Sequence, residues 1–335
     1  MLKKLMLSVI LICAHMAIVS AQAEVKLSNG SLKNISKAYG FYLGQRKSLG
    51  YIKTVYPSLR KKAAITELRF DSTFGSAVRE MDKVMTSKLA GKWEQLKKQM
   101  LPSTYEADYL QGVTFLEAEA FLEQVNQRSK GEIPEDILRV FLIFTPRYNK
   151  MPELEFAEGW KYKFVSNGSG KAKNVPFTIN IPKSWLAKEA DRPNIVQKFV
   201  SEGGYGFEQI MVMVKDTGLK PNDYITRNEI QSMVANDELV TMLPANSRLI
   251  NGGELNLSGY PGYWVHFTNT TQVGRQTAEA EMIVYGIFPE DKYVSIQGYV
   301  PTSTNGVALN TKGFEHFEKL FDLVASSFIL PNKYN

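Results

Sequence analysis

The chain has 335 residues and a formal net charge of +6, from 40 basic and 34 acidic side chains. Removing Lys3 and Lys4, which fall in a segment expected to be cleaved, leaves 38 basic residues against 34, or +4. This mild excess permits weak contact with a membrane surface but excludes a nucleic-acid-binding footprint. The single cysteine, Cys13, lies in the same segment, so the mature chain offers no disulfide, cysteine metal ligand or cysteine nucleophile.

Residues 1–23 predict a secretory signal peptide, and the mature chain is expected to begin at Glu24. A short basic start precedes an apolar run from Leu5 to Val19 and the small-x-small sequence Ala21-Gln22-Ala23. The run is short for a membrane span, and an uncleaved anchor is the competing interpretation. Ile12 is not the small residue that lipoprotein processing needs before Cys13. We therefore expect a bacterial periplasmic or secreted protein without a lipid anchor.

Residues 24–150 are expected to form a helical bundle, because apolar residues recur there at intervals of three and four. One long helix is predicted to end near Pro102 and to carry a continuous stripe of Phe70, Phe74, Val78, Met81, Met85, Leu89, Trp93 and Leu96. An N-cap at Ser103 or Thr104 is expected to start the next helix. Its predicted inner side consists of Tyr109, Val113, Leu116, Ala120 and Leu122.

Residues 151–335 are expected to form an antiparallel sheet with flanking helices, which makes the chain α+β. Beyond Glu155 the apolar period changes to two, and Gly-rich turns separate short runs that favour hairpins. The predicted strands are 160–165, 176–181, 195–200, 207–214, 248–256, 263–268, 277–288 and 292–300. One helix is expected to start near Pro221, with Tyr224 facing inward, and another to run over 311–327.

Several strand and turn sequences of this half occur together, in the same order, in one known family. They are Val175–Trp185 (VPFTINIPKSW), Asn194–Phe199, Gln209–Val214, Leu257–Trp264 (LSGYPGYW) and Phe321–Phe328. In this order they resemble the PsbP-like fold, named for an extrinsic subunit of photosystem II.

The resemblance covers roughly residues 155–330, about half of the chain, and implies an αβα sandwich. It also implies a binding or assembly role, because members of this fold are mostly non-enzymatic and one eukaryotic branch binds a small GTPase. The shared residues are structural and include no catalytic motif. The helical half resembles no family.

Side chains suited to catalysis are few. The mature chain has two histidines, His266 and His316. His266 is expected on a strand beside Trp264 and Thr268, with no second histidine nearby in sequence, and His316 on the outer face of the last helix. We expect both histidines to have structural and not catalytic roles, and we expect no cofactor and no metal site. The chain also lacks the common hydrolase, P-loop and dinucleotide motifs, so it is predicted not to be an enzyme.

The candidate binding surface consists of Tyr39, Tyr42, Arg46, Trp264 and His266. Aromatic rings that are exposed on the first helix would mark a binding face, whereas buried rings would form the bundle core.

A basic cluster formed by Arg46, Lys47, Lys53 and Arg60-Lys61-Lys62 has two interpretations. It could meet lipid headgroups or an acidic partner. The alternative is a solvated face that Glu67, Asp71 and Glu80 balance.

Three functions follow from these patterns. The first is an exported binding or assembly factor of the cell envelope that holds a protein partner or a small apolar ligand. The second is a hydrolase that uses carboxylates alone, since the spatial grouping of such residues is invisible in a sequence. The third is an envelope protein that contacts membranes through its basic helical half.

Overall fold

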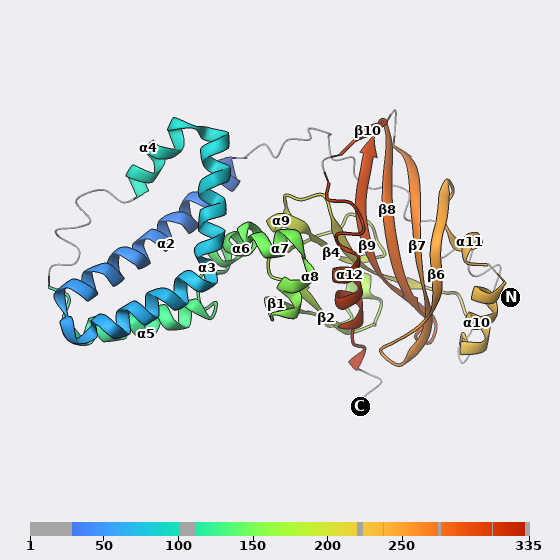
Figure 1. Ribbon diagram of the computed structural model, residues 1–335. Coiled ribbons are helices and arrows are strands. Elements are labelled where there is room, and N and C mark those ends of the chain that lie inside the picture. The colour runs from blue at the N-terminus through green and yellow to red at the C-terminus, as the bar shows by residue number, and fades with distance from the viewer. Residues whose placement is uncertain are drawn as a thin grey trace. The chain divides into compact units, whose positions relative to one another are not determined.

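The computed structural model (Figure 1) describes residues 29–100, 112–219, 224–236, 238–273, 276–309 and 311–331. The expected signal peptide and the expected N-cap at Ser103 or Thr104 lie outside these residues. The chain divides into two compact units that meet in sequence between Lys150 and Met151. The helical unit ends at Lys150, and the sheet unit begins at Met151. Helices followed by an antiparallel sheet with flanking helices confirm the α+β class.

The helical unit is built around the long helix α3. Its elements are α2 Asn29–Val55, η1 Pro57–Leu59, α3 Arg60–Leu89, α4 Gly91–Met100, α5 Phe115–Ser129, α6 Glu135–Phe144 and α7 Pro146–Lys150. The predicted stripe of α3 is buried from Phe70 to Met85. Phe74 stacks on Phe141 of α6, with ring centroids 4.7 Å apart, so the almost wholly apolar α6 lies in the core of this unit.

The predicted stripe does not continue through a single helix. Ala90 adopts φ 45° and ψ −129°, which ends α3, and Trp93 therefore belongs to the separate helix α4. A positive φ at a non-glycine residue interrupts a right-handed helix. Such a break does not change the spacing of apolar residues, so that spacing does not predict it.

The next helix also differs from the prediction. Thr114 is its N-cap, and Thr114 and Glu117 form a capping box in which the Glu117 carboxylate accepts the Thr114 N–H at 2.7 Å. Leu116, predicted to face inward, is 75% exposed. The buried face of α5 consists of Ala118, Leu122 and Val125.

The sheet unit alternates strands with short helices. Its helices are α8 Glu153–Ala157, η3 Gly170–Ala172, α9 Ser201–Gly204, α10 Arg227–Ala235, α11 Leu239–Met242 and α12 Glu318–Ser326. Its strands are β1 Lys161–Ser166, β2 Phe177–Pro182, β3 Leu186–Lys188, β4 Ile195–Val200, β5 Gln209–Asp216, β6 Ser247–Leu257, β7 Tyr260–Val273, β8 Gln276–Ile287, β9 Lys292–Thr304 and β10 Val307–Ala308.

All pairings in the sheet unit are antiparallel. The main sheet has the order β3-β4-β5-β9-β8-β7-β6, with β10 added to β9, and β1 and β2 form a separate hairpin. Each predicted strand corresponds to a strand of the structure, whereas the short strands β3 and β10 were not predicted.

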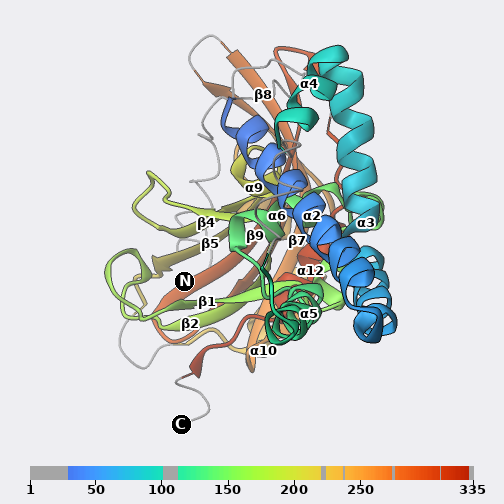
Figure 2. The same cartoon turned by 90° about the vertical axis from the view of Figure 1, so that its left-hand side faces the viewer.

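Two apolar cores lie on the two faces of the main sheet. Along β5, Ile210, Val212 and Val214 join the core under α12, while Met211 and Met213 join the core under α10 and α11. Because both faces of β5 are covered, its residues from Ile210 to Val214 are apolar in succession. Figures 1 and 2 show the β1–β2 hairpin beside α12, and Thr178 of β2 forms a bridge with Ile329 just after that helix.

The two helices predicted in this half both begin later than expected. Helix α10 starts after Thr226, which forms a capping box with Glu229, and Tyr224 is 69% exposed and does not face inward. Helix α12 starts at Glu318 and not near residue 311. Phe314 precedes it in an irregular segment but is buried against it, so burial continues where the helix does not.

Candidate functional site

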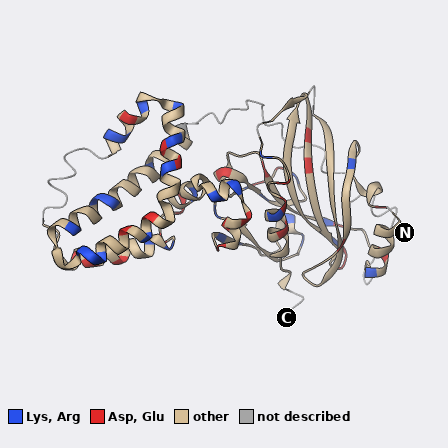
Figure 3. Ribbon diagram, viewed as in Figure 1, with Lys and Arg blue, Asp and Glu red and all other residues tan. Residues whose placement is uncertain are grey.

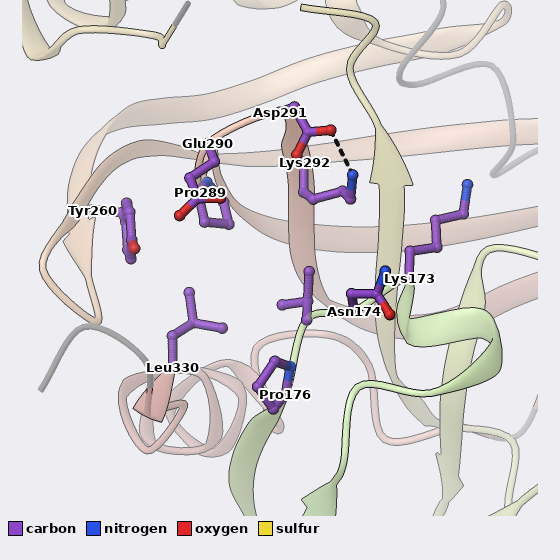
Figure 4. Close-up of a pocket in the computed structure, with 10 residues that line it drawn as sticks. Lys173, Asn174, Pro176, Tyr260, Pro289, Glu290, Asp291, Lys292 and Leu330 are labelled. Carbon is purple, nitrogen blue, oxygen red and sulfur yellow. Dashed lines mark hydrogen bonds and ion pairs between the residues drawn. The ribbon is translucent and has the colours of Figure 1, made fainter. Parts of the chain in front are cut away.

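A cleft of about 260 Å³ opens at one end of the main sheet, within the sheet unit. It lies where the β6–β7 turn, the β8–β9 turn, the segment between η3 and β2, and the chain after α12 come together (Figure 4). The apolar part of its lining consists of Val175, Pro176, Tyr260, Pro289 and Leu330.

The β6–β7 turn positions the Tyr260 ring and anchors Leu330. Ser258 and Gly259 adopt φ 52° and 77°, and two positive φ values in a two-residue loop match the right-handed twist of the strands they join. The Ser258 hydroxyl accepts the Leu330 N–H at 2.7 Å. This hydrogen bond ties the chain after α12 to the turn and closes one side of the cleft.

The opposite side of the cleft depends on a second left-handed segment. Lys173 and Asn174 adopt φ 49° and 67°, and the Asn174 N–H donates to the Gly168 carbonyl at 2.7 Å. Figure 4 shows Asn174 across the opening from Tyr260 and Pro289.

The β8–β9 turn places Glu290, Asp291 and Lys292 at the rim. The Lys292 N–H donates to the Pro289 carbonyl at 3.0 Å, which closes a four-residue turn, and Glu290 occupies it with φ 53°.

Both lysines at the rim are bound to carboxylates. Lys173 and Lys292 both pair with Asp216, Lys292 at 3.1 Å, and Lys292 also pairs with Asp291 at 2.6 Å. The hydrogen bond from Lys173 lowers the pKa of Asp216, and the hydrogen bond to Asp291 raises the pKa of Lys292. In the described part of the chain, Glu290 has no ion-pair partner.

The charge of Glu290 acts on the Tyr260 side chain, which lines the cleft. Burial, followed by the negative charge of Glu290, raises the pKa of the Tyr260 phenol. A neutral phenol and an uncompensated carboxylate thus share one wall, a combination suited to a cationic group with an apolar stem.

The two tyrosines predicted for the binding surface lie inside the helical unit. Tyr39 and Tyr42 are 8% and 5% exposed. The Tyr39 hydroxyl donates to Asp82 at 3.2 Å, and the Tyr42 hydroxyl donates to Asp71 at 2.8 Å. Their rings are packed, which matches the core alternative considered for them. The Arg46 side chain is partly exposed and pairs with Glu67 at 3.3 Å.

The other two predicted residues lie on the α12 face of the sheet unit. Trp264 packs over Gly253 of β6, where an added Cβ would come within 2.9 Å of the indole Nε1. His266 stacks on Phe314 with ring centroids 4.1 Å apart, and its Nε2 lies 2.8 Å from Oε1 of Glu281 on β8. The five predicted residues are thus divided between two units, and none of them lines the cleft.

Sequence reasoning missed both the cleft and the partner of His266. The gaps between the predicted strands 248–256 and 263–268, and between 277–288 and 292–300, imply turns at Ser258-Gly259 and Pro289-Glu290. Nothing local shows that these two turns meet. Glu281 reaches His266 through the β7–β8 pairing, in which Thr268 lies opposite Glu281.

Further chemistry is limited in the described residues. No group of three or more His, Cys, Asp or Glu side chains comes together there as a metal site. His316 lies in the turn before α12, edge-on to Phe317 at 4.9 Å, and not on the outer face of that helix. No helix of the described ranges combines the length and apolar character needed to cross a bilayer.

No protein-family model and no curated protein matches this sequence. Among solved structures, the chain is similar to the cyanobacterial PsbP of Synechocystis sp. PCC 6803, with 16% identity over 51% of this chain and 92% of that one, at a TM-score of 0.30. It is also similar to LpqN of Mycobacterium tuberculosis, described as involved in cell envelope biogenesis, with 10% identity over 53% and 96% and a TM-score of 0.30. A protein of Bacteroides thetaiotaomicron VPI-5482 shows 10% identity over 51% and 48%, at 0.29. Each of these similarities covers about half of this chain.

Proposed function

We propose that the protein is an exported, non-enzymatic binding or assembly factor of the bacterial cell envelope that holds a protein partner at the cleft of its sheet unit. The observation that carries the proposal is the cleft itself, in which an apolar wall meets a charged rim. Export rests on the basic, apolar and small-residue order of residues 1–23.

The size of the cleft favours a protein partner over a small apolar ligand. Small-molecule sites usually measure roughly 300–1,000 Å³, because they enclose most of the ligand. The cleft measures about 260 Å³, which suits a single large side chain inserted from a partner surface.

Site-specific photocrosslinking tests this proposal in the full chain. Replacing Tyr260 by p-benzoylphenylalanine is expected to yield a discrete crosslinked protein in cells that make this chain. The matched control is the same replacement at Tyr224, which lies in the same unit, is 69% exposed and does not line the cleft. With the purified partner, Tyr260→Ala is expected to weaken binding about 30-fold, as truncation of a central aromatic anchor does, and Tyr224→Ala by less than twofold. Equal crosslinking from both positions, or none from position 260, contradicts the proposal.

A hydrolase is the second candidate, and one contact favours it. A histidine within hydrogen-bond distance of a carboxylate is the arrangement that orients a general base. His266 and Glu281 meet this geometry, with side chains that are 13% and 24% exposed. We prefer the binding role because the ring is covered by Phe314 and lies outside the cleft.

The His266–Glu281 pair makes the enzymatic alternative testable. We expect chromogenic esters, glycosides and phosphate esters to be turned over no faster by the protein than by His266→Gln or Glu281→Gln. Activity that falls 100-fold or more in both variants, with Tyr224→Ala unaffected, would identify a general base and replace the binding proposal.

The basic helical half gives the membrane alternative less support. Lys53 pairs with Glu67 at 2.6 Å, and Lys62 pairs with Glu119 at 3.5 Å. Figure 3 shows acidic side chains interspersed with basic ones along α3 and α5. Local neutralisation of this kind reduces the attraction to anionic lipid.

A further inference from the structure

The charges around the cleft are unevenly satisfied. Two lysines, Lys173 and Lys292, and two carboxylates, those of Asp291 and Glu290, line the cleft, and both lysines also pair with Asp216 just outside it. Lys173 forms an ion pair with Asp216, and Lys292 forms ion pairs with Asp216 and Asp291. Among the described residues, Glu290 is therefore the carboxylate at this rim whose charge is not balanced, and an anionic occupant would meet it without a free cation.

Glu290 also occupies an unusual backbone position for a charged residue. Its φ of 53° lies in the left-handed region, where glycine is favoured because it has no Cβ. The turn itself would be served at least as well by glycine. The local turn therefore gives no reason for a glutamate side chain at position 290.

The other lining residues suit a single side chain that has an apolar stem and a planar end group. Tyr260 and Pro289 lie on one side of the opening and Leu330 and Pro176 below it, as Figure 4 shows. A guanidinium group is planar, is weakly hydrated, stacks on aromatic faces and donates two parallel hydrogen bonds to a carboxylate. An ammonium group forms no such bidentate contact, so the chemistry favours arginine over lysine.

We propose that the cleft receives an arginine side chain of the partner protein, with its guanidinium against Glu290 and its stem against Tyr260 and Leu330. This inference rests on the proposed binding function and names the group that the partner presents. It predicts that recognition depends on one charge at the rim of a pocket of modest size.

The probe is N-acetyl-L-arginine methylamide, and N-acetyl-L-citrulline methylamide is its neutral isostere. Titration into the full chain, followed by amide NMR shifts, is expected to give a Kd on the order of 1 mM for the arginine compound. The citrulline compound should bind about fivefold more weakly or worse, as should the corresponding lysine compound. Raising the salt concentration should weaken the arginine and lysine compounds but not the citrulline compound, because only the first two meet Glu290 with a charge.

Two variants separate the charge from the fold. Glu290→Gln keeps the shape of the side chain and should reduce arginine binding to the citrulline level. Glu290→Gly should lose the same binding while its Tm stays unchanged or rises by up to about 4 °C, because glycine suits the left-handed position. Loss of binding in a variant that is no less stable cannot arise from unfolding.

The outcomes distinguish this inference from the function on which it rests. Equal binding of the arginine and citrulline compounds, or full binding by Glu290→Gln, overturns the charge recognition and leaves the cleft as a binding site. No binding of either compound, with crosslinking from position 260 intact, overturns the arginine assignment alone. Loss of both signals removes the binding function as well.

Discussion

Replacement of Gly262 by alanine is expected to destabilise the sheet unit by about 3 kcal/mol or more. Gly262 lies on β7 opposite Ile287 of β8. A Cβ at this position would lie 2.1 Å from the Gly286 carbonyl oxygen and 2.7 Å from Cγ2 of Ile287. The first of these is a backbone atom in a fully paired strand, so β7 and β8 would have to move apart.

Chemical denaturation should show this loss as a lower midpoint, with hydrogen exchange assigning it to peptides from β7 and β8. Gly50→Ala in α2 is the control, because no atom lies within 4 Å of its added Cβ. In a helix interior that change should stabilise by about 0.5–1 kcal/mol. A loss below about 1 kcal/mol for Gly262→Ala would mean that the two strands separate without cost and that their close approach is not required.

The contribution of Glu155 to the free energy of unfolding should be larger at pH 5 than at pH 8 by about 2–3 kcal/mol. Glu155 of α8 is 4% exposed, and its carboxylate accepts the Ser184 N–H at 2.7 Å and the Ser184 O–H at 2.6 Å. Burial raises its pKa from 4.5 to about 7, against the opposing effect of these hydrogen bonds. A raised pKa in the folded state means that the stabilisation is complete below about pH 4.5 and is lost as the pH rises through about 7.

Glu155→Gln should remove this pH dependence, because an amide stays neutral in both states. The measurement is the free energy of unfolding from pH 5 to pH 8 for the protein and the variant, and the difference between their slopes isolates this residue. Glu189→Gln, at an exposed position of the same unit, is the control. Parallel pH profiles for the protein and Glu155→Gln would show that Glu155 is not held protonated by burial.

Much of the fold follows from local periodicity. The stripe of α3 was predictable because that helix buries one face, which imposes a period of three to four. The strands of the main sheet were predictable as short apolar or alternating runs between turns. Both faces of β5 are covered, which is why Met211 and Met213 are as apolar as their neighbours Ile210 and Val212. Prediction was poorest at element ends, because Phe314 is buried by α12 although the helix begins only at Glu318.

The candidate site was not predictable for a different physical reason. The sequence alone determined the α+β class, the point near residue 150 where one pattern replaces the other, and the scarcity of reactive side chains, since each is a property of composition or of neighbouring residues. Only the tertiary structure decided that Asn174, Tyr260, Glu290 and Leu330 surround one cleft and that Glu281 meets His266. These contacts join segments far apart in the chain, and only the folding of the whole sheet unit brings those segments together.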